Sequence, residues 1–396
     1  MIKVGVVFGG VSVEHEVSII SAVQAMNKLD TEKYEVVPIY ITKDNEWYTG
    51  SPLKEIETYK DMDLLKRFTT NVILYKKGDE FVLQKKNGFF KKIVNTIDVI
   101  LPVVHGTNVE DGSLQGYFRT IGIPFAGSDV LGSAIAQDKI VQKEIFEIHK
   151  LPITKYYWFY DSEYNMDSDE MIKNTEKEVK YPCVVKPATL GSSVGITVCA
   201  NREELEKAID EAINYDEKVV IEEKVNNLTE VNISVLGTAD NIKLSEIEEV
   251  TTGSDLLTFD DKYINGSKKS GGKKGMASAA RKVPANLPAK LEEEVRRVAT
   301  EAFKVCNLSG VVRIDFLIDQ KKNNVYINEI NSCPGSLAFY LWEPAGRSFT
   351  NLLDEMISIG VKNYKKRTNK VHTFKSNILS GYSGLKGTKG LKGKLR

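Results

Sequence analysis

The stretch V-V-K-P-A-T-L-G-S-S-V-G, residues 184–195, carries the strongest local signal in the chain. An apolar strand ends at Lys186, and a turn of small residues then leads into another strand. Small residues let backbone N–H groups approach phosphate oxygens, and a lysine adds a positive charge. Taken alone, the pattern fits a phosphate-binding hairpin and an ordinary hairpin with a solvated lysine equally well.

The sequence around this hairpin is typical of an antiparallel α+β region. Strand-like segments follow one another from residue 181 to about residue 250, with one helix expected at residues 202–213. A Lys- and Gly-rich stretch at residues 266–275 has the composition of a mobile loop. A helix is expected next at residues 288–306, followed by paired strands at 311–318 and 325–330.

These last two strands carry oxygen-bearing side chains at alternate positions. Asp315, Glu329 and Asn331 are expected on one face of the pair, with Asn328 and Ile330 on the other. Hard oxygen ligands on rigid strands suit Mg²⁺, which shares its coordination shell with nucleotide phosphates. A pair of carboxylates is also common on a solvated sheet face, but the lysine and glycine-rich turn upstream favour the phosphate and metal interpretation.

The N-terminal part has a different pattern, which predicts a parallel α/β layer. Apolar strands are expected at residues 2–8 and 36–41, and between them apolar residues recur at helical spacing from Val17 to Leu29, with Ser12 as the N-cap. Two strands at residues 72–83 flank a hairpin signal, and one more strand is expected at 96–104. This first domain is expected to close near residues 130–140.

The expected strand at residues 96–104 runs directly into H-G-T-N-V-E-D-G, which contains His105, Glu110 and Asp111. A glycine-rich loop with ionisable groups at the carboxyl end of a strand is where open α/β sheets bind ligands. His105 could equally be a satisfied core or loop residue. Without a spaced His or Cys partner, a zinc site is not indicated.

The bulk composition excludes several classes of protein. The 396 residues have a formal net charge of +0, 42% hydrophobic and 27% charged residues, which argues against a general nucleic-acid or membrane-surface binder. No apolar run approaches the length of a membrane helix. The 4 cysteines show no C-x-x-C spacing and indicate buried thiols in a reducing cytoplasm.

Two common nucleotide-binding fingerprints are also missing. The segment F-G-G-V-S lacks G-x-G-x-x-G, and no G-x-x-x-x-G-K-[ST] occurs. Nucleotide binding therefore requires another architecture. From residue 365 to 396 the chain is basic and contains no acidic residue, which predicts a flexible tail, with an anionic partner as the alternative.

The motifs, in their order along the chain, resemble those of the D-alanine–D-alanine ligase family of the ATP-grasp superfamily. The matching segments are F-G-G-V-S-V-E-H-E-V-S, H-G-T-N-V-E-D-G-S-L-Q-G, I-P-F-A-G-S, Q-D-K-I-V-Q-K, V-V-K-P-A-T-L-G-S-S-V-G, F-D-D-K-Y, V-R-I-D-F and N-E-I-N-S-C-P-G. They cover residues 8 to about 335, and the basic tail lies outside the match.

The resemblance implies a fold of the α/β and α+β classes, in which an N-terminal parallel α/β domain precedes an ATP-grasp fold. The implied limits are residues 1–138 for the substrate domain, 139–236 for the central ATP-binding part, 237–364 for the part with the metal and a lid loop, and 365–396 for the tail.

The resemblance implies ATP-dependent joining of two D-alanine molecules through an acyl phosphate, with Mg²⁺ or Mn²⁺, for peptidoglycan synthesis. It also implies a cytoplasmic homodimer. The alternatives are a ligase that takes D-serine or another second substrate, a different ATP-grasp carboxylate–amine ligase, and a nucleotide-binding protein without activity.

The resemblance further implies a role for each matching residue. The residues of the catalytic group are Glu14, which anchors the ammonium of the first substrate, Ser192 and Tyr263, which are linked to it, and Arg313, which stabilises the oxyanion. The substrate-binding residues are His105, Gly335, Tyr340 and Leu341. The nucleotide-binding residues are Lys139, Lys186, Ser193, Glu222, Glu223, Glu230 and Lys262. The metal ligands are Asp315, Glu329 and Asn331.

Three positions depart from the family pattern. Val109 replaces a usual glycine beside Glu110, and Lys224 stands where many relatives have an aromatic residue. Tyr340 stands where a serine binds the carboxylate of the second substrate. A phenol can donate a hydrogen bond, but its volume reshapes the pocket, so the identity of the second substrate stays open.

Overall fold

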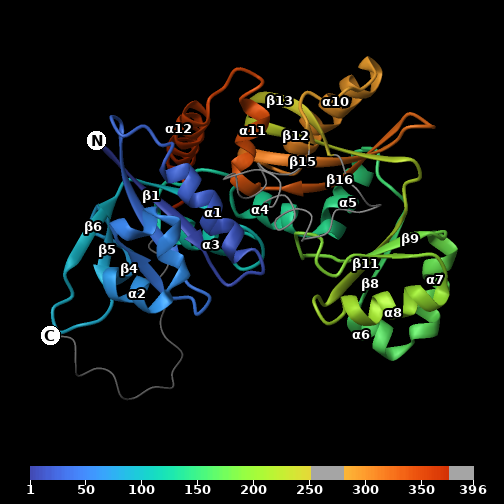
Figure 1. The fold of residues 1–396 in the computed structure, drawn as a ribbon, viewed down its shortest axis with the longest axis horizontal. Helices are drawn as coiled ribbons and strands as arrows, with labels where there is room; N and C mark the ends of the chain where they lie inside the picture. Colours follow the sequence, from blue (N-terminus) through green and yellow to red (C-terminus); the bar gives the residue numbers. More distant parts are fainter. Residues whose placement is uncertain (251–280, 374–396) are drawn as a thin grey trace, which may run out of the picture.

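The structure is a computed structural model that describes residues 1–250 and 281–373. Its strands form three sheets, arranged along the long axis of the molecule (Figure 1). The first sheet has seven strands in the order β6-β5-β4-β3-β2-β1-β7, the second has four in the order β10-β9-β11-β8, and the third has five in the order β14-β13-β12-β15-β16.

The first sheet contains the N-terminal part of the chain. Its strands are β1 (Ile2–Gly9), β2 (Tyr34–Ile41), β3 (Trp47–Thr49), β4 (Thr70–Lys77), β5 (Glu80–Lys85), β6 (Ile93–Ile97) and β7 (Val99–Val103). The strand β1 pairs in parallel with β2 and β7, as the sequence predicts, whereas β2 to β6 pair antiparallel. The helices and 3-10 turns in this part are α1 (His15–Met26), η1 (Ser51–Lys54), η2 (Ile56–Lys60), α2 (Met62–Phe68) and α3 (Ser113–Ile121).

Two local expectations for this region are wrong. The single strand expected at residues 96–104 is two strands, β6 and β7, because the chain changes strand partners at Asp98, whose carboxylate accepts a hydrogen bond from the Lys3 N–H at 2.7 Å. Ser12 is not the N-cap of α1, because the cap position is Glu14. The Ser12 hydroxyl accepts a hydrogen bond from the Glu14 N–H at 3.1 Å instead, so it orders the loop that leads into the helix.

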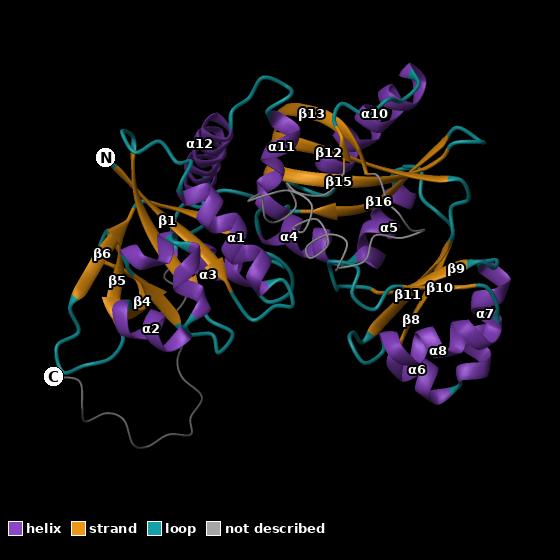
Figure 2. Cartoon of the chain, viewed as in Figure 1, coloured by secondary structure: helices purple, strands orange, loops and turns teal. Residues whose placement is uncertain are grey.

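The second and third sheets are antiparallel, and the helices pack on them as separate layers (Figure 2). The second sheet consists of β8 (Tyr156–Tyr160), β9 (Cys183–Pro187), β10 (Thr197–Cys199) and β11 (Lys218–Glu223). The third consists of β12 (Leu228–Thr238), β13 (Asn241–Val250), β14 (Arg281–Lys282), β15 (Gly310–Asp319) and β16 (Asn324–Asn331). The remaining helices are α4 (Val130–Gln137), α5 (Lys139–Ile148), α6 (Asp161–Met166), α7 (Ser168–Glu178), α8 (Arg202–Ala212), α10 (Ala289–Val305), η5 (Gly335–Ala338), α11 (Phe339–Trp342) and α12 (Phe349–Thr368).

The first sheet packs apolar side chains on both faces, since Val4, Val6 and Phe8 of β1 belong to one cluster and Val7 belongs to another. In the third sheet, Ile314, Phe316 and Phe303 are among the residues that fill the layer between β15 and α10. None of the helices within the described ranges is long and apolar enough to cross a membrane. The strand β12 spans the domain limit expected between residues 236 and 237, and the helix α12 continues beyond residue 364 to Thr368. The domain limits stay predictions.

Candidate active site

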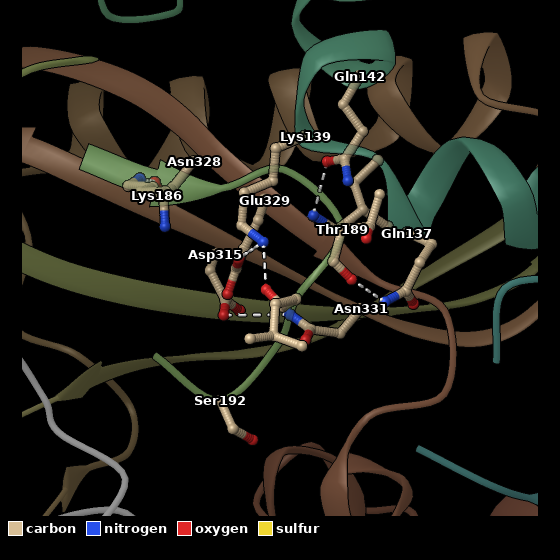
Figure 3. A network of polar contacts seen from close by, with 12 residues as sticks. Gln137, Lys139, Gln142, Lys186, Thr189, Ser192, Asp315, Asn328, Glu329 and Asn331 are labelled. Carbon is tan, nitrogen blue, oxygen red and sulfur yellow. Dashed lines mark hydrogen bonds and ion pairs between the residues drawn. The ribbon is translucent and has the colours of Figure 1, made fainter. Parts of the chain in front are cut away.

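The second and third sheets meet where β9 and β16 approach each other, and Figure 3 shows the polar side chains between them. The Lys186 ammonium on β9 donates a hydrogen bond to Asn328 Oδ1 on β16 at 3.1 Å. Nearby, the side-chain oxygen of Gln142 on α5 accepts a hydrogen bond from the Ile330 N–H at 2.9 Å. The hairpin with the strongest sequence signal is therefore joined to the strand with the expected metal ligands.

The contact between Lys186 and Asn328 corrects one expectation. Asn328 was expected to face away from the site, on the side opposite Glu329. The pairing of β15 with β16 shifts between Asp315 and Phe316, which pair with Glu329 and Ile327. This β-bulge leaves Asn328 without a partner in the register, and its side chain turns toward the lysine. Asn328 is a site residue that the sequence analysis missed.

A buried carboxylate gathers two lysines close to this point. Glu222 is 2% exposed, and its two carboxylate oxygens lie 3.0 Å from the ammonium groups of Lys143 and Lys186. The Thr154 hydroxyl donates a further hydrogen bond to Glu222 at 2.9 Å. Although burial acts to raise the pKa of Glu222, the two lysines lower it to about 2. Both carboxylate oxygens of Glu222 thus have lysine partners, and the ion pair holds the Lys186 ammonium in place. The contact of Glu222 with the nucleoside stays a prediction.

Lys143 is a second residue that the sequence analysis missed. It is buried, and burial lowers its pKa, while Glu222 opposes this effect. It follows Lys139 by four residues on the same helix, so both side chains lie on one face. The four-residue spacing of the two lysines in Q-D-K-I-V-Q-K is the sequence feature that could have identified Lys143.

Lys139 also points into the cleft. Its ammonium donates a hydrogen bond to the Leu190 carbonyl at 2.6 Å and lies 3.8 Å from the Glu329 carboxylate. Burial lowers the pKa of Lys139, and Glu329 opposes this effect. The lysine thus bridges the turn after β9 and the acidic strand β16, which is a position from which a cation can bind a phosphate.

The turn after β9 is tight because two of its residues are left-handed. Ser192 has φ 56° and Ser193 has φ 62°, and the Val194 N–H donates to the Gly191 carbonyl at 3.3 Å. The Ser192 hydroxyl donates a short hydrogen bond to a carboxylate oxygen of Glu14. A Cβ atom at Gly191 would lie 2.7 Å from the other Glu14 oxygen, so a larger residue here would displace the Glu14 side chain. The structure therefore brings Glu14 and Ser192 together, as the resemblance implies.

His105, which follows β7, is buried. One ring nitrogen is 2.7 Å from the Cys333 carbonyl and the other is 2.9 Å from the Ser21 hydroxyl. Burial lowers the pKa of His105, so the neutral ring donates to the carbonyl and accepts from the serine. The Ser21 hydroxyl also accepts a hydrogen bond from the Ser336 N–H at 2.9 Å. His105 thus connects α1 to the turn after β16, and both of its nitrogens already have protein partners.

Glu110 makes a parallel connection. Its carboxylate accepts hydrogen bonds from the Gly106 N–H at 2.9 Å, the Cys333 N–H at 2.8 Å and the Ser332 hydroxyl at 3.1 Å. Burial and the charge of Glu14 raise its pKa to about 7, although the three donors act in the opposite direction. Val109 beside it is buried against Gly10, so this departure from the family pattern serves packing.

Arg313 and Asp315 form a bidentate ion pair on β15, with two N–O distances of 2.7 Å. The Asn331 side-chain amide donates a hydrogen bond to Asp315 at 3.2 Å. Although burial disfavours the charge, Asp315 keeps the pKa of Arg313 well above its usual range. A permanent positive charge therefore lies next to the expected metal ligands.

The expected metal ligands lie on adjacent strands, with Asp315 paired to Glu329 and Arg313 paired to Asn331 in the register. No group of three or more His, Cys, Asp or Glu side chains within residues 1–250 and 281–373 is arranged to hold a metal. Two carboxylates and an amide oxygen nevertheless fit Mg²⁺, which takes few protein ligands and completes its shell with water and phosphate. The residues present are compatible with that ion.

The remaining predicted residues are more dispersed. Glu223 ends β11 and Glu230 lies on β12 opposite Val250, both half-buried. Gly335 begins η5, and Leu341 is fully buried. Tyr340 contacts Glu248 rather than opening into the cleft, with 3.5 Å between its hydroxyl and the carboxylate. Lys262, Tyr263 and the Lys-rich loop lie outside the described residues.

Family models match most of the chain. The description "D-ala D-ala ligase N-terminus" matches residues 3–128, and "D-ala D-ala ligase C-terminus" matches residues 145–358. The D-alanine--D-alanine ligase of Thermosipho melanesiensis is 38% identical over 380 residues, which cover 96% of this chain and 98% of the relative. This chain belongs to the D-alanine–D-alanine ligase family.

Solved ligase structures agree with this family assignment. The D-alanine-D-alanine ligase from Coxiella burnetii superposes with a TM-score of 0.77 at 25% identity, covering 93% of this chain and 96% of that one. The VanG D-Ala:D-Ser ligase from Enterococcus faecalis gives 0.75 at 28% identity, covering 91% and 99%. The expected ATP-grasp fold with an N-terminal α/β domain is thereby confirmed.

In this member of the D-alanine–D-alanine ligase family, the predicted site residues lie in two groups. Lys139, Lys186 and the turn at residues 188–196 (the phosphate turn) lie where the second and third sheets meet, and Arg313 lies on β15 next to Asp315. Glu14, which contacts the turn through Ser192, forms the boundary with the first sheet.

Proposed function

We propose that this chain joins two D-alanine molecules to D-alanyl-D-alanine, with ATP converted to ADP and phosphate. The contact of Ser192 with Glu14 carries the proposal, because it joins a phosphate turn to a carboxylate that can hold an ammonium group. The same residues would otherwise form two unrelated sites. The dipeptide is a building block for peptidoglycan, which is the process that we propose the chain serves.

In the first step, a carboxylate oxygen of the first D-alanine attacks the γ-phosphorus. The bond from that phosphorus to the β–γ bridging oxygen breaks, and ADP leaves with the electron pair. Two anions must approach each other, so positive charge is required. Lys139 and Lys186 supply it from α5 and β9, while Glu14 holds the substrate ammonium. Water must be excluded from the site, because it would hydrolyse the acyl phosphate.

In the second step, the amine of the second D-alanine attacks the carbonyl carbon of the acyl phosphate. The C–O bond to phosphate then breaks, phosphate leaves with the electron pair, and the proton that the amine loses to give the amide goes to the departing phosphate or to water. Negative charge develops on the carbonyl oxygen, and Arg313 is the group that stabilises it. Asp315 holds the guanidinium in a fixed orientation, so little reorganisation is needed during the reaction.

Asp315, Glu329 and Asn331 are the residues that would hold Mg²⁺ or Mn²⁺, which would neutralise charge on the nucleotide phosphates. Glu329 already lies 3.8 Å from Lys139, so the acidic strand and the phosphate-binding lysine adjoin each other. Lys262 and Tyr263, which lie outside the described residues, are proposed to contact phosphate and Ser192, respectively.

D-Serine is the second candidate for the incoming amino acid. Tyr340 stands at the position expected for a carboxylate-binding serine, and VanG, a similar structure, is described as a D-Ala:D-Ser ligase. D-Alanine remains the first choice because the curated relative from Thermosipho melanesiensis, 38% identical over 96% of this chain, is named for it.

The proposal is tested by phosphate release from ATP over a panel of paired D-amino acids and D-hydroxy acids, with products identified by mass. The proposal is supported if phosphate is released when D-alanine is the only amino acid present and the product has the mass of D-alanyl-D-alanine. Release only with another acceptor would assign a different ligase activity. Size-exclusion chromatography with light scattering and cell fractionation test the accompanying proposals of a homodimer in the cytoplasm.

A further inference from the structure

A buried carboxylate lies behind the position expected to bind the second amino acid. Glu248 on β13 is 2% exposed and accepts a hydrogen bond from the Asn232 side chain at 2.9 Å. The hydroxyl of Tyr340, on α11, is 3.5 Å from the same carboxylate oxygen and donates toward it. A phenol has one proton to donate, so a hydroxyl directed at Glu248 does not also donate to a substrate carboxylate.

Arg281 covers this pair. Its guanidinium lies 3.1 Å from the second oxygen of Glu248, and its Cζ is 3.9 Å from the centre of the Tyr340 ring. The side chain is 13% exposed. The stacking and the ion pair together fix the plane and the position of the guanidinium, so this cation is oriented before any substrate arrives.

The cluster is within electrostatic reach of the reaction centre. Burial and Glu248 raise the pKa of Tyr340, and both Arg313 and Arg281 act to lower it. In the strand register, Glu248 on β13 pairs with Asn232 on β12, which pairs with Asp315 on β15, so the cluster lies two strands from the ion pair of Arg313 with Asp315.

A substrate carboxylate at this position needs a cation. Glu248 alone would repel it, and a neutral phenol would not offset that repulsion in a buried site. A guanidinium has five donors in a planar fork, so it can bind a substrate carboxylate while it keeps the ion pair with Glu248. Arg281 has the charge, the donor geometry and the position for this task.

We propose that Arg281 binds the carboxylate of the second amino acid, with Glu248 and Tyr340 as positioning residues. The inference rests on the proposed ligase function. It assigns to Arg281 the role that the resemblance gives to the position of Tyr340. The inference also predicts that the site selects the second amino acid mainly by its free carboxylate and less by its side chain.

The test compares D-alanine with D-alaninamide, which lacks the carboxylate, as competing acceptors in the presence of ATP. The two products are quantified by mass. The wild-type enzyme is expected to prefer D-alanine, and R281M to reduce that preference at least ~10-fold, since one partner of a buried charge contact is lost.

Two further variants separate binding from packing. R281K keeps the positive charge but loses the planar guanidinium, so its preference for D-alanine is expected to lie between those of wild type and R281M. If R281M does not fold, R281K provides the test. Y340F keeps the ring beneath Arg281 and is expected to keep the wild-type preference within ~3-fold. An unchanged preference in R281M or R281K, or its loss in Y340F, would overturn the inference. A wild-type enzyme that releases no phosphate with D-alanine would instead refute the proposed function.

Discussion

At the scale of single residues, burial disfavours the charged form of Glu110. Its pKa rises from 4.5 to about 7, chiefly through burial. Between these two values the unfolded chain has lost the proton and the native chain keeps it. The native state therefore binds more protons, and stability falls as the pH rises through this window, by ~3 kcal/mol in total.

The variant E110Q removes this titration. The free energy of unfolding of wild type relative to E110Q is expected to decrease between pH 4.5 and pH 8, as measured by urea denaturation. Glutamine places an N–H group against a backbone donor, so E110Q is less stable at low pH, and only the change with pH is diagnostic. The exposed Glu293 on α10 is the matched control, and E293Q should show no such trend. A constant difference between wild type and E110Q across the range would refute the assignment.

The buried pair of Lys143 and Glu222 allows a double-variant test. K143M leaves Glu222 with Lys186 as its one remaining ion-pair partner among those described and should cost about 3 kcal/mol of unfolding free energy. K143M combined with E222Q should cost clearly less than the sum of the two single changes, because neither charge is then left buried and unpaired. Chemical denaturation of the four proteins measures the coupling. Costs that simply add would show that the pair does not act as a unit.

The residue scale also shows what the sequence can predict. The contact of Glu14 with Ser192 and the placement of Lys139 and Lys186 near the same turn are expected from the resemblance to the family. The inward turn of Asn328 does not, because a β-bulge shifts the alternation of side chains by one residue and leaves no sequence pattern of its own.

At the scale of elements, the turn between β9 and β10 depends on a close approach. Gly191 has no strained φ, but a Cβ there would lie 2.7 Å from a Glu14 oxygen. G191A is therefore expected to lower kcat/KM for D-alanine at least ~10-fold through displacement of Glu14, with a small change in stability. Steady-state kinetics and thermal unfolding measure the two effects.

The control for G191A is Gly116, in the helix α3, where an added Cβ would have no neighbour within 4 Å. G116A should keep the activity and raise the unfolding free energy by about 0.5 to 1 kcal/mol. Equal kinetics for G191A and wild type would show that the turn does not position Glu14.

Most elements follow from hydrophobic periodicity, but two kinds do not. The break between β6 and β7 depends on Asp98 bonding to the backbone of Lys3, which is distant in sequence. The turn after β16 contains three successive left-handed residues that are not glycine, Ser336, Leu337 and Ala338, with φ of 50° to 52°. Nothing in their residue types predicts this, since it costs backbone energy and is maintained by burial and by the Ser21 contact.

At the scale of the whole molecule, the site exists because three sheets meet. The first contributes Glu14, His105 and Glu110, the second contributes Lys186, and the third contributes Arg313 and the acidic residues. Motif order along the chain predicts this assembly better than any single motif. The sequence around Tyr340 does not predict that its hydroxyl faces Glu248, because this contact depends on how β13 and α11 pack.

The central claim, that the chain activates a D-alanine carboxylate with ATP and then forms a peptide bond, is tested by oxygen tracing. D-Alanine labelled with ¹⁸O in its carboxylate is incubated with ATP, and the released phosphate is analysed by mass. An acyl phosphate pathway transfers one labelled oxygen to phosphate for each dipeptide formed. Phosphate that carries no label, or label without the dipeptide, would contradict the account.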